Sequence, residues 1–460
     1  MLFKRSCYFR PEGDWAILAN SKGNIISVNK FATIILELMS DDWITVKNLA
    51  KKLLCVDDYF KSMDKEYLED IVLSFINDMI KEEMIVSNQE TDYDENVEIS
   101  KVIFNTEQQN SVVFSNPLMS IVEITNRCNQ NCKFCYVDLE KEGRIAKDPK
   151  LSDLFVICDE LIKHKIFTIN FLGGEPILRF DDLICLIKYV NSKNSNIHCT
   201  FATNGSADGG ITKERALQLS KLKNISIRIS IHGYKKDHDE IVGMPSAYNI
   251  ALQSLRNLLK YAPNVLVSVA TTISKNNINN IEKMLYDLFV NVGVQSIEIV
   301  PIQPVGQAKN NNVNYFNSKE EISVMNFFNM QSEKWSKKNK YLVYGSKYNE
   351  YVKPLKFKNE VVSCGIKHSI YIDTKGDCYV CHMSVGYDEF KIGNIYTTEL
   401  DQMWVSKNRK KLISALSPSE ICSKCNVHSC TNGCIVAAYI NNGSLNEIDP
   451  CCPWINRKED

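Results

Sequence analysis

The sequence lacks long apolar runs, and its net charge is close to zero. No stretch approaches the roughly 18 apolar residues that a membrane-spanning helix needs. No apolar segment follows the charges near the start, as a secretion signal would require. We therefore expect a cytoplasmic protein without a membrane partner. A formal net charge of −1 gives no electrostatic reason to expect nucleic acid as a partner.

Cysteine, by contrast, is abundant, with 17 residues. Disulfides are not expected, because a cytoplasmic compartment keeps thiols reduced. Most cysteines gather in two regions and a C-terminal pair, with Cys-x2-Cys spacings that indicate metal or iron–sulfur ligation. The scattered ones are expected to be small buried hydrophobes: Cys7, Cys55, Cys158, Cys185 and Cys199.

A length of 460 residues favours about three domains. In residues 1–88, alternating apolar residues predict a hairpin (15–18 with 25–28) and a terminal strand (84–86). Apolar residues at helical spacing predict three helices between them (31–39, 46–54 and 67–80). Together these elements make a winged-helix-like pattern. DNA binding is the obvious alternative for such a domain. Residues 1–100 hold 11 Lys and Arg against 19 Asp and Glu, however, and phosphates would be repelled. Residues 89–115 form an acidic linker.

From residue 116 the pattern changes to strands that alternate with helices, which predicts parallel β/α units. The expected strands are 120–125, 168–172, 198–202, 226–231, 266–271 and 296–300. Six units are fewer than the eight of a full barrel, so we expect an α/β fold built on a partial (β/α)6 TIM barrel over 116–309. Residues 310–362 are expected to form a bridging region with a helix at 319–336. Residues 363–460 form a cysteine-rich domain in which metal replaces a core.

Three cysteines directly follow the first barrel strand: Cys128, Cys132 and Cys135. Three thiolates on one short loop can hold three irons of a four-iron cluster and leave the fourth iron open. A zinc site would usually need a fourth protein ligand, and the loop contains none. The spacing, with Phe134 before the last cysteine, resembles the cluster loop of the radical S-adenosylmethionine (SAM) enzymes.

Other strand ends carry residues that match this family. The run Gly173, Gly174, Glu175, Pro176 resembles its GGEP motif, which implies that these residues receive the methionyl amino group. Glycines also allow close backbone approach. The resemblance implies that Ser230 contacts the ribose, that Thr271 and Val300 border adenine, and that Phe134 shields the cluster. One electron from the cluster would then cleave SAM into a 5′-deoxyadenosyl radical that abstracts hydrogen from a substrate. No catalytic acid or base stands out.

The second cysteine population resembles the SPASM extension of these enzymes, which holds two auxiliary iron–sulfur clusters. The resemblance implies that Cys364, Cys381 and Cys434 bind the first cluster. It implies a second cluster bound by Cys422, Cys425, Cys430 and one of Cys451 or Cys452. Cys378 is extra: it either completes the first cluster or is a spectator, in which case one iron stays open to a substrate thiolate. The chain has four residues before Cys430 where the family has five, and a pair of zinc sites is the alternative.

Together, the three parts resemble the sactisynthase group of peptide maturases. This resemblance implies SAM and three [4Fe-4S] clusters as cofactors, and an electron donor such as flavodoxin or ferredoxin. It implies a leader-bearing precursor peptide as partner, bound as an added strand by the N-terminal domain, and thioether formation between a cysteine sulfur and a carbon. The alternatives are carbon–carbon crosslinking, formylglycine formation in a sulfatase, and a zinc-bearing binding protein without enzyme activity.

Overall fold

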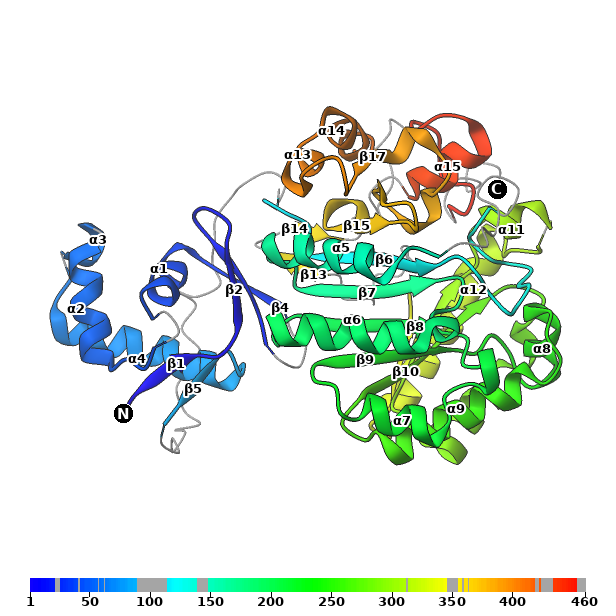
Figure 1. Cartoon of the computed structure of the whole chain (residues 1–460), viewed down its shortest axis with the longest axis horizontal. Helices are drawn as coiled ribbons and strands as arrows, with labels where there is room; N and C mark the ends of the chain where they lie inside the picture. The colour runs from blue at the N-terminus through cyan, green and yellow to red at the C-terminus, as the bar shows by residue number, and fades with distance from the viewer. Residues whose placement is uncertain are drawn as a thin grey trace. The chain divides into compact units, whose positions relative to one another are not determined.

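The computed structural model divides the chain into two compact units (Figure 1). One is Met1–Ser115 with two short pieces, 195–198 and 356–361, and the other holds the rest. The structure describes residues 1–20, 25–39, 42–56, 58–61, 63–88, 114–138, 148–311, 313–345, 355–357, 360–362, 364–417, 422 and 433–452. Within these residues no helix is both long and apolar enough to span a membrane.

The N-terminal unit combines a small sheet with helices, as the sequence predicts. Its strands β2 (Tyr8–Pro11), β3 (Ala16–Ala19) and β4 (Ile25–Val28) form an antiparallel sheet, and β1 (Phe3–Arg5) pairs with β5 (Ile85–Ser87). Its helices are α1 (Lys30–Met39), α2 (Val46–Val56), α3 (Asp58–Lys61) and α4 (Lys65–Lys81). The hairpin of β3 and β4 is confirmed, and β2 extends it.

Local signals set the helix starts in this unit. The Asn29 side chain accepts a hydrogen bond from the Ala32 amide at 3.0 Å, and Asp64 accepts from the Glu66 amide at 2.9 Å. Such caps satisfy amides that a helix leaves without partners. The apolar faces of the helices then meet in a core of their own, in which Leu36 and Leu49 are fully buried.

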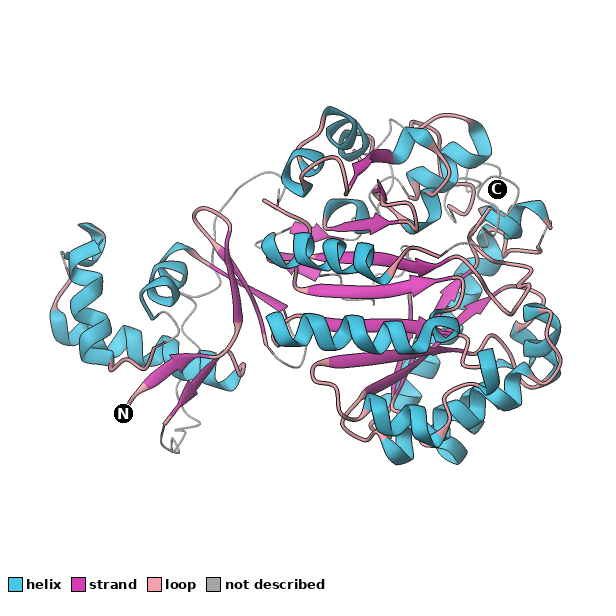
Figure 2. Cartoon of the chain, in the orientation of Figure 1, coloured by secondary structure: helices cyan, strands magenta, loops and turns pink. Residues whose placement is uncertain are grey.

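A ten-stranded sheet organises the second unit, in the order β12-β11-β10-β9-β8-β7-β6-β15-β16-β17 (Figure 2). All six predicted barrel strands are present: β6 (Met119–Thr125), β7 (Thr168–Gly173), β8 (His198–Thr203), β9 (Ile225–Ser230), β10 (Leu266–Ile273) and β11 (Ser296–Pro301). They lie side by side in chain order. Their carboxyl ends therefore meet at one edge, where the loops that follow them gather.

Two further strands lengthen the sheet on both sides. β12 (Tyr341–Tyr344), within the expected bridging region, pairs in parallel with β11. β15 (Ser369–Ile372), within the cysteine-rich part, pairs in parallel with β6. β16 (Asp377–Tyr379) and β17 (Lys391–Asn394) continue the sheet in antiparallel fashion. The cysteine-rich part is thus hydrogen-bonded to the barrel sheet, while β13 (Leu355–Phe357) and β14 (Glu360–Val362) form a separate pair.

Helices separate the barrel strands and pack around the sheet (Figure 2). They are α5 (Leu151–Lys163), α6 (Phe180–Lys193), α7 (Lys213–Leu219), α8 (Lys236–Val242), α9 (Ala247–Tyr261), α10 (Ile281–Tyr286), α11 (Gly306–Asn310) and α12 (Ser318–Ser336). The C-terminal part adds α13 (Leu400–Trp404), α14 (Lys407–Ser414) and α15 (Ile435–Asn442). The sequence predicts α5, α6, α7, α9, α10 and α12, but it does not predict α8, α11 or the three helices of the C-terminal part.

The scattered cysteines do not all follow the prediction. Cys7, Cys158 and Cys199 are buried, and burial raises the pKa of the Cys199 thiol to about 12. Cys55 on α2 and Cys185 on α6 are exposed, so the expectation of burial is wrong for these two. Both belong to amphipathic helices, and their positions fall on the outer faces.

Candidate active site at the ends of the barrel strands

A pocket of about 330 Å³ opens at the carboxyl ends of the barrel strands. The loop after β6 brings Cys128, Cys132 and Cys135 to it, each partly exposed. Of the other residues predicted from the sequence, the pocket contains Phe134, Gly173, Gly174, Glu175, Ser230 and Val300. Residues from separate strands therefore meet in one cavity, in the place that the barrel topology predicts.

The spacing of the three thiols suits a cluster better than one ion. Zinc bonds to sulfur are about 2.3 Å long, so one tetrahedral zinc ion would hold its thiolates within about 4 Å of one another. Among the described residues, the one group of three ligand atoms that lie within 4.8 Å of one another contains none of these cysteines. A four-iron cluster binds each thiolate to a different iron and needs a wider spacing. The residues therefore fit a cluster.

Two helices that the sequence does not predict hold the cysteine loop. At the end of α8, the carbonyls of Val242 and Ile241 accept hydrogen bonds from the amides of Asn131 and Lys133, both at 3.0 Å. At the start of α11, the Gln307 amide donates to the Cys135 carbonyl at 2.8 Å. These contacts fix the loop backbone on both sides of Cys132 and at Cys135.

Gly306, the first residue of α11, allows this close approach. Its φ is +52°, and a Cβ atom there would lie 2.3 Å from the Tyr136 carbonyl oxygen. Both the backbone conformation and the lack of space favour glycine. The end of the cysteine loop therefore packs directly on the α11 backbone.

Gly173 at the end of β7 and Gly174 after it make a close contact within the protein. A Cβ atom on Gly173 would lie 2.1 Å from the Thr125 carbonyl oxygen, and one on Gly174 would lie 2.3 Å from that of Arg127. The Gly174 amide donates to Thr125 and the Glu175 amide to Arg127, both at 2.8 Å. The glycine run thus continues the pairing of β6 with β7 into the start of the cysteine loop. This packing is a reason for the glycines that the sequence alone does not reveal.

Glu175 is almost fully buried at the base of the pocket, with 1% exposure. One carboxylate oxygen accepts hydrogen bonds from the Thr203 hydroxyl at 2.5 Å and the Ile177 amide at 2.9 Å, and the other accepts from the Asn204 amide at 2.7 Å. Burial raises the pKa of this carboxyl to about 7, although the hydrogen bonds oppose that shift. The group is held rigidly, as a partner for a cationic ligand requires.

A polar network joins the cysteine loop to the end of β8. The Asn204 side chain donates to Asn129 at 2.8 Å and accepts from the Ser206 amide at 2.8 Å, and Gln130 donates to the Ser206 hydroxyl at 3.0 Å. Two donors also approach the Cys128 sulfur: the Gln130 amide at 3.5 Å and the Asn204 side chain at 3.9 Å. The residues Thr203, Asn204 and Gly205, at the end of β8 and directly after it, form the centre of this network.

Thr271 and Pro176, two of the residues predicted to contact the cofactor, do not line this pocket. The fully buried Thr271 hydroxyl donates to the Ile231 carbonyl at 2.7 Å, and the next residue, Thr272, borders the pocket. Successive strand residues point to opposite faces, so the pocket position expected of Thr271 belongs to Thr272. Pro176 is buried and begins a short 3-10 turn, Pro176–Arg179, outside the pocket lining. Its fixed φ suits the first position of such a turn.

Aromatic and histidine side chains complete the wall. The Phe134 ring meets the His232 ring edge-on, with 4.6 Å between centroids. From the cysteine-rich part, His382 and Met383 line the same pocket, and the His382 ring lies edge-on to Tyr136 at 4.8 Å. His232 and Met383 are not expected from the sequence, since neither belongs to a recognisable motif.

The remaining cysteines differ in their surroundings. Cys378 on β16 is fully buried, its thiol lies 3.6 Å from the Gly376 carbonyl, and burial raises its pKa. The other described members of the group are all partly exposed: Cys364, Cys381, Cys422, Cys434, Cys451 and Cys452. Cys425 and Cys430 lie outside the described residues.

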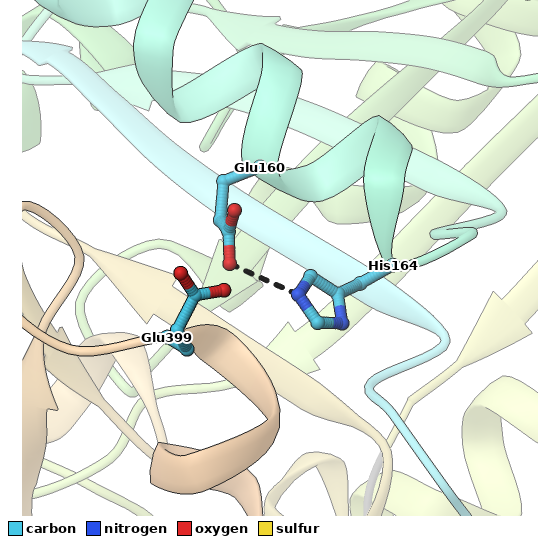
Figure 3. A group of neighbouring side chains, drawn as sticks. All are labelled: Glu160, His164 and Glu399. Carbon is cyan, nitrogen blue, oxygen red and sulfur yellow. Dashed lines mark hydrogen bonds and ion pairs between the residues drawn. The ribbon is translucent and has the colours of Figure 1, made fainter.

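A second group of ligand-type side chains lies outside the pocket (Figure 3). Glu160 in the last turn of α5 and His164, which directly follows this helix, face Glu399, which directly precedes α13. His164 bonds to Glu160 at 2.9 Å, the Leu400 amide donates to Glu160 at 3.1 Å, and the Lys163 ammonium contacts Glu160 and Glu399. The lysine already supplies a positive charge, so the group fastens α13 to α5.

Comparison with known proteins agrees with this geometry. The model of the radical SAM superfamily matches residues 122–288, and the SPASM model, described as an iron–sulfur cluster-binding domain, matches residues 364–426. Mycofactocin maturase MftC of Mycobacterium tuberculosis is 24% identical over 347 residues, which are 73% of this chain and 83% of that protein.

Solved structures show the same fold. The crystal structure of Streptococcus suis SuiB bound to precursor peptide SuiA has a TM-score of 0.70 at 15% identity and covers 98% of this chain and 100% of that one. SuiB bound to S-adenosylmethionine has a TM-score of 0.68 at 16% identity and covers 97% and 98%. With its three-cysteine pocket and its cysteine-rich C-terminal part, the chain belongs to the radical SAM superfamily and carries a SPASM iron–sulfur cluster-binding domain.

Proposed function

We propose that this protein is a radical SAM enzyme that modifies a ribosomally synthesised precursor peptide and joins a cysteine sulfur to a carbon of another residue. The observation that carries the enzyme assignment is the meeting of the three-cysteine loop with Gly174 and Glu175 in one pocket. When bound, a reduced cluster and SAM supply a carbon-centred radical that removes hydrogen from a substrate.

The pocket residues then have distinct positioning roles. Cys128, Cys132 and Cys135 hold three irons of the cluster. Glu175, fixed by three hydrogen bonds, accepts the amino group of the methionyl end. Ser230, Thr272 and Val300, from neighbouring strand ends, border the nucleoside end. Phe134 excludes water from the space between the two ends.

A peptide substrate is supported by the similar proteins. MftC is described as a maturase, and SuiB was crystallised with a precursor peptide. The N-terminal unit has its own core and a three-stranded sheet whose edge strands are β2 and β4, and an edge strand is the position at which a peptide can add as a further strand. We propose that this unit binds the leader of the precursor peptide.

The C-terminal cysteines are proposed to hold two auxiliary clusters, which makes three in all. Cys364, Cys381 and Cys434 would bind the first cluster, and Cys378, buried within β16, would leave one of its irons open. The second would use Cys422, Cys425, Cys430 and one of Cys451 or Cys452. The open iron would bind the substrate thiolate before the C–S bond forms.

The reaction balances with one hydrogen atom, one proton and one electron. A substrate C–H bond loses its hydrogen atom to the nucleoside radical, and the cysteine S–H loses its proton. A C–S bond forms, and the one surplus electron passes to the auxiliary clusters. A flavodoxin or ferredoxin would supply the electron that starts each turnover.

The test uses anaerobically reconstituted enzyme with SAM and dithionite. Wild-type enzyme should release 5′-deoxyadenosine, and Cys132→Ala should release less than about a hundredth as much, because the cluster loses one of its three protein ligands. Cys185→Ala, which removes an exposed thiol on α6, is the matched control and should retain full release. Undiminished release by Cys132→Ala would refute the proposal.

The linkage is tested on the product peptide. Mass spectrometry of the precursor peptide should show a loss of two hydrogens for each bond. A thioether also removes one alkylatable cysteine thiol per bond. A two-hydrogen loss with every thiol still alkylatable indicates carbon–carbon crosslinking and overturns the thioether assignment.

A further inference from the structure

His232 lies in the pocket wall just beyond the end of β9. It is 8% exposed, and it borders the pocket with Ser230 and Thr272. Nothing in the sequence pattern marks it, and no step proposed above uses it. Its ring is nevertheless held on several sides, which is unusual for a polar side chain without a role.

The ring position is fixed by two neighbours, Phe134 and His238. The Phe134 ring packs edge-on at 4.6 Å, and the His238 ring is stacked at 5.9 Å with 14° between planes. The backbone amide of His232 also donates to His238 Nδ1 at 3.0 Å. Rotation of the His232 ring would break this packing, so the nitrogen positions are well defined.

A hydrogen bond sets the tautomer of His232. Its Nδ1 atom accepts from the Thr272 backbone amide at 3.0 Å. A neutral imidazole that accepts at Nδ1 carries its proton on Nε2. Burial, together with the nearby His238, lowers the pKa of His232 to about 3, so the ring stays neutral at physiological pH. Nε2 is therefore a permanent hydrogen-bond donor.

Among the described residues, no side chain or carbonyl accepts a hydrogen bond from His232 Nε2, and this atom is not sealed inside the protein. The pocket is the open space that His232 borders. A hydrogen-bond donor that is nine-tenths buried, borders a ligand pocket and has no acceptor among the described residues indicates that the ligand supplies the acceptor.

We propose that the Nε2–H group of His232 donates a hydrogen bond to an acceptor on the nucleoside half of S-adenosylmethionine, which is the 2′ or 3′ hydroxyl oxygen of the ribose or N3 of adenine. This rests on the proposed function. The methionyl amino group is assigned to Glu175 at the end of β7, whereas His232 lies two strands away, beyond β8, at the end of β9. The methionyl ammonium group is itself a donor and cannot accept a hydrogen bond from His232.

The test measures binding by the reconstituted holoenzyme, not turnover. The probe is 5′-deoxyadenosine, which lacks the methionyl half and reports on the nucleoside end alone. His232→Leu should weaken its affinity about three- to tenfold, as expected for one lost hydrogen bond to a neutral group. Cluster absorption should match the wild type, because His232 is not a ligand. An unchanged affinity for 5′-deoxyadenosine would overturn the proposal.

Analogues locate the acceptor. The 2′-deoxy, 3′-deoxy and 3-deaza forms of 5′-deoxyadenosine each remove one candidate atom. One of them should bind the wild type several-fold more weakly than the parent compound but bind His232→Leu no more weakly than the parent does. Equal losses for every analogue in both proteins would place the acceptor elsewhere and overturn the proposal. If His232→Leu does not fold, His232→Gln replaces it and should bind the parent within about twofold of wild type; a larger loss counts against donation.

These outcomes are separate from failure of the proposed function. Wild-type holoenzyme that neither binds 5′-deoxyadenosine nor releases it from S-adenosylmethionine would remove the proposed function itself. Wild-type binding that is indifferent to all three analogues would remove only the role of His232.

Discussion

At the scale of residues, Glu175 combines burial with three hydrogen-bond donors, and its titration should be visible in stability. Its pKa is raised from 4.5 to about 7, so between these values the folded protein holds a proton that the unfolded chain has released. The stability that this proton contributes is complete below about pH 4.5 and declines as pH rises through 7.

The unfolding free energy of Glu175→Gln should therefore not show this decline as pH rises through 7. For a shift of this size the missing change in unfolding free energy is on the order of 3 kcal/mol. Urea unfolding at pH 5, 6, 7 and 8 without SAM measures it. Glu240→Gln, at an exposed position on α8, should retain the wild-type decline. An identical pH profile for Glu175→Gln and wild type would contradict this account of the carboxyl group.

Gly174 should tolerate no side chain. Gly174→Ala places a Cβ atom 2.3 Å from the Arg127 carbonyl oxygen, so the start of the cysteine loop must move. We expect about 1–3 kcal/mol of lost stability and clearly less bound iron after reconstitution. Gly345→Ala is the control, because its nearest neighbour is a Val300 methyl group at 3.1 Å, which can shift. Wild-type iron content in Gly174→Ala would show that this approach is not needed.

Single residues also mark the limit of sequence-based prediction. The cysteine loop, Glu175 and Val300 are predicted because motif and strand order place them at the pocket. The prediction of Thr271 is off by one position, because successive strand residues point to opposite faces of the sheet and Thr272 is the one that lines the pocket. His232 could not be predicted, because its tautomer and burial depend on neighbours that are distant in the sequence.

At the scale of elements, long periodic segments are predicted well and short ones are not. All six barrel strands follow their alternating or apolar runs. The helix α8 has only seven residues, of which His238, Ile241 and Val242 are buried, and so few positions give no clear period. β15 depends on its pairing with β6, a contact that no local pattern contains.

The pairing of β15 with β6 leads to a test by truncation. β15 covers one edge of β6, and without it the backbone groups of a core strand would be open to pairing with other chains. A chain that ends at Gly345 should yield a much smaller soluble fraction on expression than the full chain. A soluble, monomeric truncated protein in size-exclusion chromatography would show that the edge needs no cover.

At the scale of the whole molecule, the two units should be separable in function. Deletion of residues 1–88 removes the N-terminal core but leaves every strand of the ten-stranded sheet. We expect release of 5′-deoxyadenosine within about twofold of wild type and loss of modification of the leader-bearing precursor peptide. Modification at the wild-type rate would exclude a leader-binding role.

The pairing of β6 with β15 also affects how the chain folds during its synthesis. Residues 119–122 pair with residues 369–372, so about 250 residues must be added between the synthesis of the two strands. At about 5–20 residues per second, β6 is synthesised roughly 12–50 s before its partner β15 exists. During this interval one edge of β6, the strand that leads into the cysteine loop, lacks its partner. The yield of the protein in the cell should therefore depend on chaperones that bind nascent chains more than on the stability of the finished fold.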